Sequence, residues 1–162
     1  MLPKIVDSFE PVAAITSGSL AGAKICSILG DQQSSAYAHE LKLHEAKITY
    51  GTGCFLLANI GNSPIIHPSF VTTIMFRHKG EIQYGFECSV ECGGGTLNWA
   101  RRAGFFNNYS ELNSWEDISK ESLYFFPSFG EIYAPYWKTG VQGGLVGLNL
   151  STSRNQIVAA LL

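Results

Sequence analysis

The chain has 162 residues, a length that fits one domain burying most of its apolar surface. Charged residues make up only 15% of it, against about 25% in a typical soluble domain. Two interpretations explain this low value equally well: part of the surface is covered by something else, or the domain is compact and nearly neutral. The net charge of −2 argues against a nucleic-acid-binding protein, and the absence of any run of about 18 apolar residues argues against a membrane span.

The first half of the sequence predicts strands around one helix. Residues 24–30 end at a glycine after small and branched residues, which predicts a buried strand. Asp31 then takes the N-cap position of a helix predicted over residues 32–43. Four more strands are predicted, over residues 47–52, 54–60, 70–76 and 81–88, and His78-Lys79-Gly80 joins the last two as a turn.

The second half predicts more helix than strand. Residues 89–106 become helical after Gly93-Gly94-Gly95, and a short helix is predicted over residues 114–120. A strand over residues 123–126, an irregular segment over 127–144 and a helix over 155–162 complete the chain. The order of these elements predicts an α/β class, one sheet with helices packed on it.

The four cysteines, Cys26, Cys54, Cys88 and Cys92, form no pair of CxxC modules, so no zinc site is predicted. We expect buried free thiols, and Cys88 and Cys92 would share a helix face if that segment is helical. The N-terminal apolar stretch is interrupted by polar residues and makes a poor signal peptide. A reducing, cytoplasmic location is the resulting expectation.

Asp31 is the first candidate for chemistry. An aspartate at the end of a strand, beside Gly30, can reach a ligand bound over the carboxyl edge of an open α/β sheet. Its carboxylate could accept the proton of a hydroxyl that attacks a phosphoryl group, and Gln32 could offer a polyol both a donor and an acceptor. The alternative is that Asp31 only caps the following helix.

Gly51-Thr52-Gly53 is the second candidate. Two glycines allow backbone N–H groups to turn toward an anion, and the Thr52 hydroxyl adds a further donor. The alternative is a tight hairpin that needs glycine for its dihedral angles. Phe55, just beyond, would ordinarily belong to the core.

Gly93-Gly94-Gly95 is the third candidate, because glycines at a helix N-terminus let a phosphate approach the backbone. Close packing of the helix explains the same glycines equally well. The segment matches neither the dinucleotide-binding fingerprint nor the P-loop.

Several strings resemble, in collinear order, motifs of the glycerol kinases in the FGGY carbohydrate-kinase family. They are Gly30-Asp31-Gln32-Gln33, Thr49-Tyr50-Gly51-Thr52-Gly53-Cys54-Phe55, Ala134-Pro135-Tyr136-Trp137 and Gly143-Gly144-Leu145-Val146-Gly147-Leu148. The resemblance covers nearly the whole chain. It implies an actin-like, ribonuclease-H-like ATPase fold with a mixed sheet, packed helices and ATP bound between two domains.

The same resemblance implies roles for individual residues. Asp31 would be the base that activates a glycerol hydroxyl, Gln32 a glycerol contact, and Phe55 a side chain packed on the glycerol carbons. Cofactor contacts would come from Gly51, Thr52, Gly53, Gly94 and Asn98, and the cofactors would be ATP and Mg²⁺. No residue is expected to bind a metal directly.

The resemblance also implies that this chain is incomplete. Residues 1–30 would lead in from a preceding domain, and residues 31–162 would form the first part of the C-terminal domain. The parent protein would phosphorylate glycerol to glycerol 3-phosphate and form a homo-oligomer, whereas these residues alone would be inactive. Asn98 replaces a family glutamine and Glu91 enters an apolar run, so an inactive binding protein is an alternative, as is a kinase of another polyol or sugar.

Overall fold

The computed structural model describes residues 3–114 and 123–162, and the contacts among them define two units. Unit 1 comprises Met1–Thr49 and Leu56–Cys88, and unit 2 comprises Tyr50–Phe55 and Ser89–Leu162. Both strands and helices occur among the described residues, as the sequence predicts for the α/β class.

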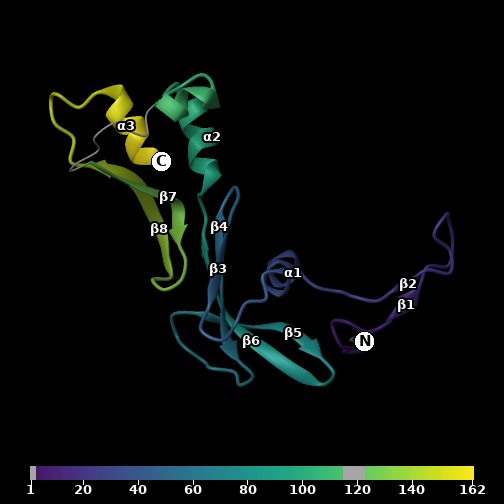
Figure 1. The fold of residues 1–162 in the computed structure, drawn as a ribbon. Helices are drawn as coiled ribbons and strands as arrows, with labels where there is room; N and C mark the ends of the chain where they lie inside the picture. The colour runs from purple at the N-terminus through teal and green to yellow at the C-terminus, as the bar shows by residue number, and fades with distance from the viewer. Residues whose placement is uncertain (1–2, 115–122) are drawn as a thin grey trace. The chain divides into compact units, whose positions relative to one another are not determined.

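Unit 1 contains most of a four-stranded sheet (Figure 1), of which the ends of three strands are counted with unit 2. Its strands are β3 (Ala46–Tyr50), β4 (Cys54–Gly61), β5 (Val71–His78) and β6 (Glu81–Val90), in the spatial order β3-β4-β6-β5. β5 and β6 pair antiparallel, and the turn between them holds Lys79 and Gly80, which both have positive φ. That backbone matches the tight turns that join right-twisted strands, so the predicted hairpin is confirmed.

Helix α1 (Asp31–Ala38) belongs to unit 1 and packs on the sheet through its buried Ala36, which contacts the cluster of Leu57 and Met75. Burial of a leucine or methionine side chain stabilises a fold by about 1.5–3 kcal/mol. The helix is shorter than predicted because the chain leaves helical geometry at Glu40, where φ is +50°. The N-cap is Gly30, and Asp31 is the first helical residue, so the predicted cap position of Asp31 is wrong by one residue.

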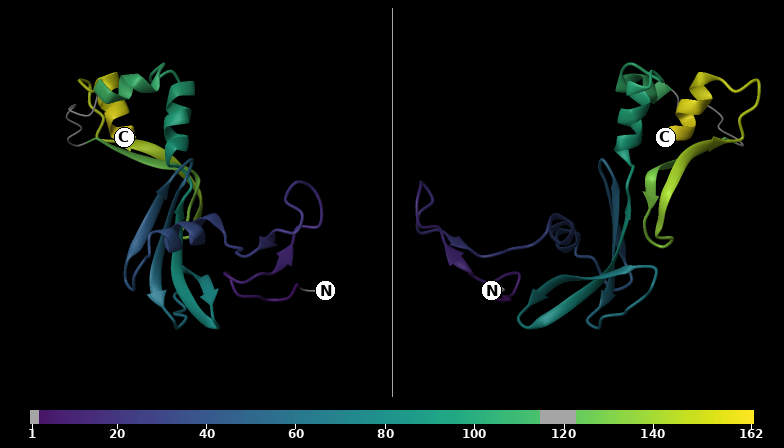
Figure 2. Two further views of the ribbon diagram at one scale, coloured as in Figure 1. Left: turned by 45° about the vertical axis from the view of Figure 1, so that its right-hand side comes forward. Right: turned by 180° about the vertical axis from the view of Figure 1, so that it is seen from behind.

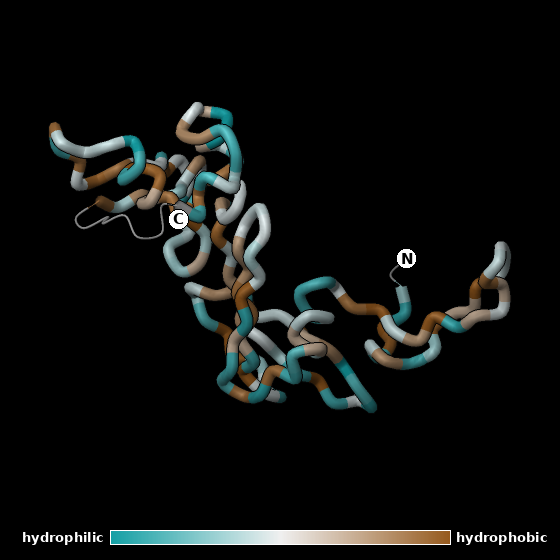
Figure 3. Tube along the Cα trace, turned by 45° about the horizontal axis from the view of Figure 1, so that its top comes forward, coloured by the Kyte–Doolittle hydropathy of each residue, from teal (hydrophilic) through white to brown (hydrophobic). Residues whose placement is uncertain are grey.

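The segment before α1 forms the short antiparallel pair β1 (Ala13–Ala14) and β2 (Lys24–Ile25). An ion pair between Asp7 and Arg77, 2.9 Å long, and the Ser8 N–H donating to the Arg77 carbonyl tie this segment to β5. The buried strand predicted over residues 24–30 is wrong: Ile28 is 60% exposed. Figure 3 shows hydrophobic stretches along this segment, but among the described residues β2 pairs only with the two-residue β1.

Unit 2 contains α2 (Gly94–Arg102), the 3-10 helix η1 (Tyr109–Ser114), the strands β7 (Tyr124–Ile132) and β8 (Lys138–Val146), and α3 (Arg154–Leu161). Helices α2 and α3 contact each other, and α3 also contacts β7 (Figures 1 and 2). Their shared core is made of Ala100, Phe106 and Val158. The helix predicted over residues 114–120 lies outside the described residues apart from Ser114.

Residues 127–144 were expected to be irregular, but most of them lie in the antiparallel hairpin of β7 and β8. Proline and glycine in this stretch hide the period-two alternation of a strand. Gly143 has a role in pairing, since a Cβ there would lie 2.6 Å from the Phe126 carbonyl oxygen. The buried Ser128 hydroxyl donates to the Val141 carbonyl over 3.0 Å and joins the two strands further.

The predicted C-terminal helix is confirmed as α3, which begins with a capping box. The Ser153 hydroxyl accepts the Gln156 N–H at 3.2 Å, and the Gln156 side chain accepts the Ser153 N–H at 2.9 Å. Two of the donors that a helix start leaves unpaired are thereby satisfied. In the described parts of the chain, we find no helix with the length and hydrophobicity needed to cross a membrane.

All four cysteines are free thiols, as expected. Cys26 is exposed, however, and the other three are only partly covered, so the expectation of buried thiols is wrong for Cys26 and only partly met by the others. Cys88 lies on strand β6, which also rules out a helix face shared with Cys92. Burial is the main cause that raises the pKa of both Cys88 and Cys92, and neighbouring Glu87 and Glu91 raise them further.

Candidate active site

Asp31 and Gln32 open helix α1 of unit 1. The Asp31 side chain is exposed, and its Oδ1 accepts the Gln32 backbone N–H at 2.8 Å. A carboxylate in the first turn of a helix is favoured by the helix dipole. The structure therefore gives Asp31 a local hydrogen bond of the capping kind and also leaves its carboxylate accessible for proton transfer.

The Gln32 side chain lies against strand β3 of the same unit. Lys47 donates a short hydrogen bond to Gln32 Oε1 and a second one, 2.7 Å long, to Thr49 Oγ1. The Thr49 hydroxyl in turn lies 3.1 Å from Gln32 Oε1. Sequence reasoning missed Lys47 and Thr49, although their spacing of two along a strand was a signal that both face the same side.

Lys47 is a buried charged residue, only 9% exposed. Burial lowers the pKa of its ammonium group, while the nearby carboxylates of Asp31 and Glu87 act in the opposite direction. A buried cation is tolerated when hydrogen bonds and opposite charges compensate its lost hydration. Gln32, Thr49, Asp31 and Glu87 supply both kinds of compensation here.

In unit 2, the loop of Gly51, Thr52 and Gly53 packs on the start of α2. The Gly93 N–H donates to the Thr52 carbonyl at 2.8 Å, and the Gly94 N–H donates to the Gly51 carbonyl at 2.8 Å. The Gly95 N–H donates to the Thr52 carbonyl at 2.9 Å. The structure thus brings together two glycine segments that the sequence offered as separate candidates.

Close approach explains why these positions are glycine. A Cβ on Gly53 would lie 2.8 Å from the Val90 carbonyl oxygen, and one on Gly93 would lie 2.7 Å from Cys54 Sγ. β3 and β4 are neighbours in the sheet and flank this loop, so the tight hairpin of the alternative is present, but neither Gly51 nor Gly53 has a positive φ that would require glycine. Packing of backbone against backbone is the requirement instead.

The same hydrogen bonds change the expected anion site. The N–H groups of Gly93, Gly94 and Gly95 already donate to carbonyls of the Gly51 loop, so they are not free to bind a phosphate. Thr52 is exposed, and its hydroxyl makes no hydrogen bond to the residues that the structure describes. The Thr52 side chain is therefore one donor that this loop offers to a ligand.

Phe55 lies in β4, directly after this loop, and is 38% exposed. The expectation that it would belong to the core is wrong. An accessible aromatic face suits contact with the carbon atoms of a small ligand.

Gly94 and Asn98 lie four residues apart on α2, hence on one face of the helix, and both are exposed. The Asn98 Oδ1 accepts the hydroxyl of Tyr109. Since the oxygen is engaged, the amide presents its N–H donors to a ligand. The Arg101 guanidinium lies 5.3 Å from the centre of the Tyr109 ring and adds a cation–π contact there.

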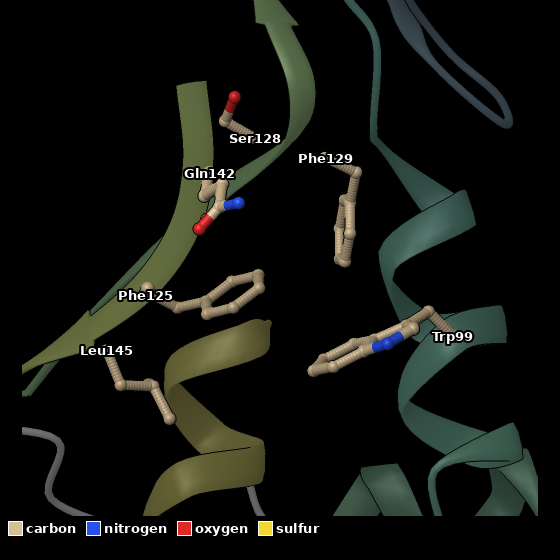
Figure 4. Close-up of a pocket in the computed structure, with 8 residues that line it drawn as sticks. Trp99, Phe125, Ser128, Phe129, Gln142 and Leu145 are labelled. Carbon is tan, nitrogen blue, oxygen red and sulfur yellow. The ribbon is translucent and has the colours of Figure 1, made fainter. Parts of the chain in front are cut away.

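An apolar pocket of about 360 Å³ also lies within unit 2 (Figure 4). The Trp99 and Phe125 rings stack with centroids 6.0 Å apart, and Phe129 packs on Trp99 at 5.2 Å. Figure 4 shows these three rings facing one another. The pocket contains none of the predicted site residues and is lined by rings that pack against each other.

The predicted site residues fall into two groups. Asp31 and Gln32 lie together in unit 1, whereas the Gly51 loop, Phe55, Gly94 and Asn98 lie in unit 2. Over residues 3–114 and 123–162, no three His, Cys, Asp or Glu side chains gather as a metal site. Among the predicted site residues, the groups available to a ligand are the accessible Asp31 carboxylate, the fixed Gln32 amide and the glycine loop with the Thr52 hydroxyl.

Known proteins resemble this chain both in fold and in sequence. In fold, the chain is similar to Plasmodium falciparum glycerol kinase, whose crystal structure was solved with ADP. The TM-score is 0.84 at 27% sequence identity, and the match covers 96% of this chain and 32% of that one. It is also similar to xylulose kinase from Rhodospirillum rubrum, with a TM-score of 0.74, 16% identity and coverage of 99% and 34%. This is the actin-like, ribonuclease-H-like ATPase fold.

In sequence, the C-terminal domain of the FGGY family of carbohydrate kinases matches residues 46–162. The chain is 36% identical to the glycerol kinases of Methylobacterium radiotolerans and Haemophilus influenzae and 32% identical to that of Arabidopsis thaliana. All of this chain is covered in each case, and about a third of the relative's length. The chain belongs to the FGGY family of carbohydrate kinases, which confirms the resemblance inferred from its motifs.

Proposed function

We propose that the intact protein, meaning this chain with any further residues of its polypeptide, transfers the γ-phosphoryl group of ATP to glycerol. The observation that carries the proposal is the accessible Asp31 carboxylate beside a fixed Gln32 amide, in a chain similar over its whole length to glycerol kinases. The product would be glycerol 3-phosphate.

The proposed reaction is an in-line displacement at phosphorus. A glycerol hydroxyl oxygen forms a bond to the γ-phosphorus while the bond to the β-bridging oxygen breaks, and ADP leaves. Asp31 accepts the proton of the attacking hydroxyl, and Gln32 and Phe55 hold the polyol in place. Positioning and stabilisation of charge supply most of the catalysis in phosphoryl transfer.

We propose that ATP contacts the Gly51 loop and α2. The Thr52 hydroxyl donates to a phosphate oxygen, while Gly53 and Gly94 keep the loop and the helix close enough to form that surface. Asn98 donates its amide N–H groups to the nucleotide. Its side chain is one methylene shorter than glutamine, and Tyr109 fixes its direction.

Mg²⁺ belongs to the proposal as the partner of ATP. The described residues supply no dedicated cage for a cation, which fits an ion held mainly by phosphates and water with at most one or two carboxylates. Bound together with ATP, the ion would neutralise phosphate charge.

We also propose that residues 1–30 lead into a domain of which residues 31–162 form the first part. Coverage of about a third of each glycerol kinase and the match of residues 46–162 to a C-terminal domain support the placement in that domain, while the boundary at residue 31 rests on the resemblance. On the same basis, these 162 residues alone would be inactive. A cytoplasmic location and a homo-oligomeric state rest on the resemblance to the family.

The test is a panel of acceptors with the purified intact protein. Glycerol, xylulose and gluconate are offered with Mg²⁺ and ATP, and ADP formation is measured for each. We expect the highest kcat/KM for glycerol. A higher value for xylulose or gluconate would reassign the substrate.

A second candidate function is binding without catalysis. The short Asn98 side chain and the exposed, charged Glu91 next to the glycine segment favour it. Calorimetry with glycerol and an ATP analogue, combined with the ADP assay in the presence of ATP, separates the two functions, because an inactive homologue would bind both ligands and form no ADP.

A further inference from the structure

Lys47 has no role in the proposed reaction, yet it is a charged residue buried next to the proposed glycerol contact. Its side chain reaches from β3 to the start of α1, and both elements belong to unit 1. Burying an ammonium group is costly, so its hydrogen bonds merit a functional account.

The side chains of Lys47, Gln32 and Thr49 form a closed triangle of hydrogen bonds. The donor and the acceptor of each bond follow from the chemistry of these groups. A lysine ammonium only donates, so the atom of Gln32 that faces it is the carbonyl oxygen. Lys47 also donates to Thr49 Oγ1, which leaves the Thr49 hydroxyl proton for Gln32 Oε1 at 3.1 Å. The Gln32 amide oxygen therefore receives two donors from the same strand.

The orientation of the Gln32 amide follows from this arrangement. With the oxygen held against β3, the NH₂ group is the part of the amide left for a ligand. Gln32 then acts toward a polyol as a donor alone, whereas the sequence allowed either role. A hydroxyl oxygen of the substrate is the matching acceptor.

Electrostatics supports the same arrangement. The carboxylates of Asp31 on α1 and Glu87 on β6 both favour the charged form of Lys47 and oppose the effect of its burial. The ammonium form has three N–H donors and no acceptor, so it can donate to Gln32 and Thr49 together.

We propose that Lys47 is a positioning residue for substrate binding, which fixes the Gln32 amide as a hydrogen-bond donor to a hydroxyl of the acceptor substrate. Thr49 assists by completing the triangle. The proposal rests on the proposed function, since it takes Gln32 to be the contact to glycerol.

The experiment is a double-mutant cycle in the intact protein. Lys47→Met keeps an unbranched side chain one heavy atom shorter and removes its donors. We expect kcat/KM for glycerol to fall about tenfold, the loss of roughly one hydrogen bond, with KM for ATP unchanged. In a Gln32→Ala background, Lys47→Met should cause no further loss, because its effect passes through Gln32.

Two further variants keep the test valid if Lys47→Met folds poorly. Thr49→Val removes the hydroxyl at nearly constant shape and should raise KM for glycerol, while Thr49→Ser restores the hydroxyl and the affinity. Lys42→Met, at an exposed lysine, is the matched control and should have no effect.

The outcomes separate this role from the proposed function. Additive losses in the double mutant, or equal increases in KM for ATP and glycerol, would show a merely structural role and overturn the proposal for Lys47 alone. A wild-type protein that neither binds nor phosphorylates glycerol would overturn both proposals.

Discussion

Gly53 shows how a single residue connects packing with the proposed nucleotide loop. Its missing Cβ is what allows the loop to approach the end of β6, since a methyl group there would lie 2.8 Å from the Val90 oxygen and 2.9 Å from the Glu91 oxygen. Both are backbone atoms, so they cannot move away from an added methyl group as the end of a flexible side chain could.

We therefore expect Gly53→Ala to destabilise the intact protein by about 1–3 kcal/mol, the usual cost of overpacking. Gly51→Ala is the matched control, because its Cβ would meet nothing closer than an ordinary contact of 3.5 Å with the Gly53 oxygen. Urea denaturation measures both. Equal destabilisation of the two variants would contradict the packing argument.

The lowered pKa of Lys47 predicts that the stability of the protein depends on pH. Burial lowers the pKa of folded Lys47 below its value of 10.5 in the unfolded chain. Between these two values the unfolded state binds more protons, so the contribution of Lys47 to the free energy of unfolding rises with pH.

Stability measured against pH for wild type and Lys47→Met isolates this effect. The wild type should gain stability relative to the variant as pH rises toward 10.5, with a slope of at most about 1.4 kcal/mol per pH unit for one titrating group. A difference that stays constant would show that folding leaves the proton affinity of Lys47 unchanged, and one that shrinks would show that folding increases it; either result would contradict the lowered pKa.

At the scale of elements, the capping box of α3 makes a local prediction. Ser153→Ala removes the acceptor for the Gln156 N–H and should destabilise the start of the helix by about 1 kcal/mol. Hydrogen exchange of the Gln156 amide should become faster. Ser153→Asp retains an acceptor and should keep the protection, so equal exchange in the two variants would argue against the cap.

Strands and helices with clear local signals could be predicted from the sequence. The β5–β6 hairpin has alternation and a glycine turn, and α3 has a serine followed three residues later by glutamine. The β7–β8 hairpin was missed because Gly143 serves the close pairing of two strands, a contact that local patterns do not contain. For residues 24–30 the prediction failed in the other direction. Their apolar side chains indicated a buried strand, but in the described structure few other residues pack on them, and Ile28 is exposed.

At the scale of the whole molecule, the sequence yielded the fold and family through motifs in collinear order. Asp31 and the Gly51 loop stood out because carboxylates and paired glycines are recognisable as residue types. Lys47 did not stand out, because its importance lies in burial and in contacts between β3 and α1. The engaged N–H groups of Gly93 to Gly95 were equally invisible, since hydrogen-bond partners distant in sequence decide which donors remain free.

Asp31 is the residue that we propose as the base in phosphorylation of glycerol. The most direct test compares kcat for ATP-dependent glycerol phosphorylation in the intact wild-type protein and in Asp31→Asn, with Glu40→Gln as an exposed control. We predict that kcat falls by about 10²–10⁴ in Asp31→Asn, while the control and KM for ATP remain unchanged. Undiminished turnover in Asp31→Asn would contradict the account.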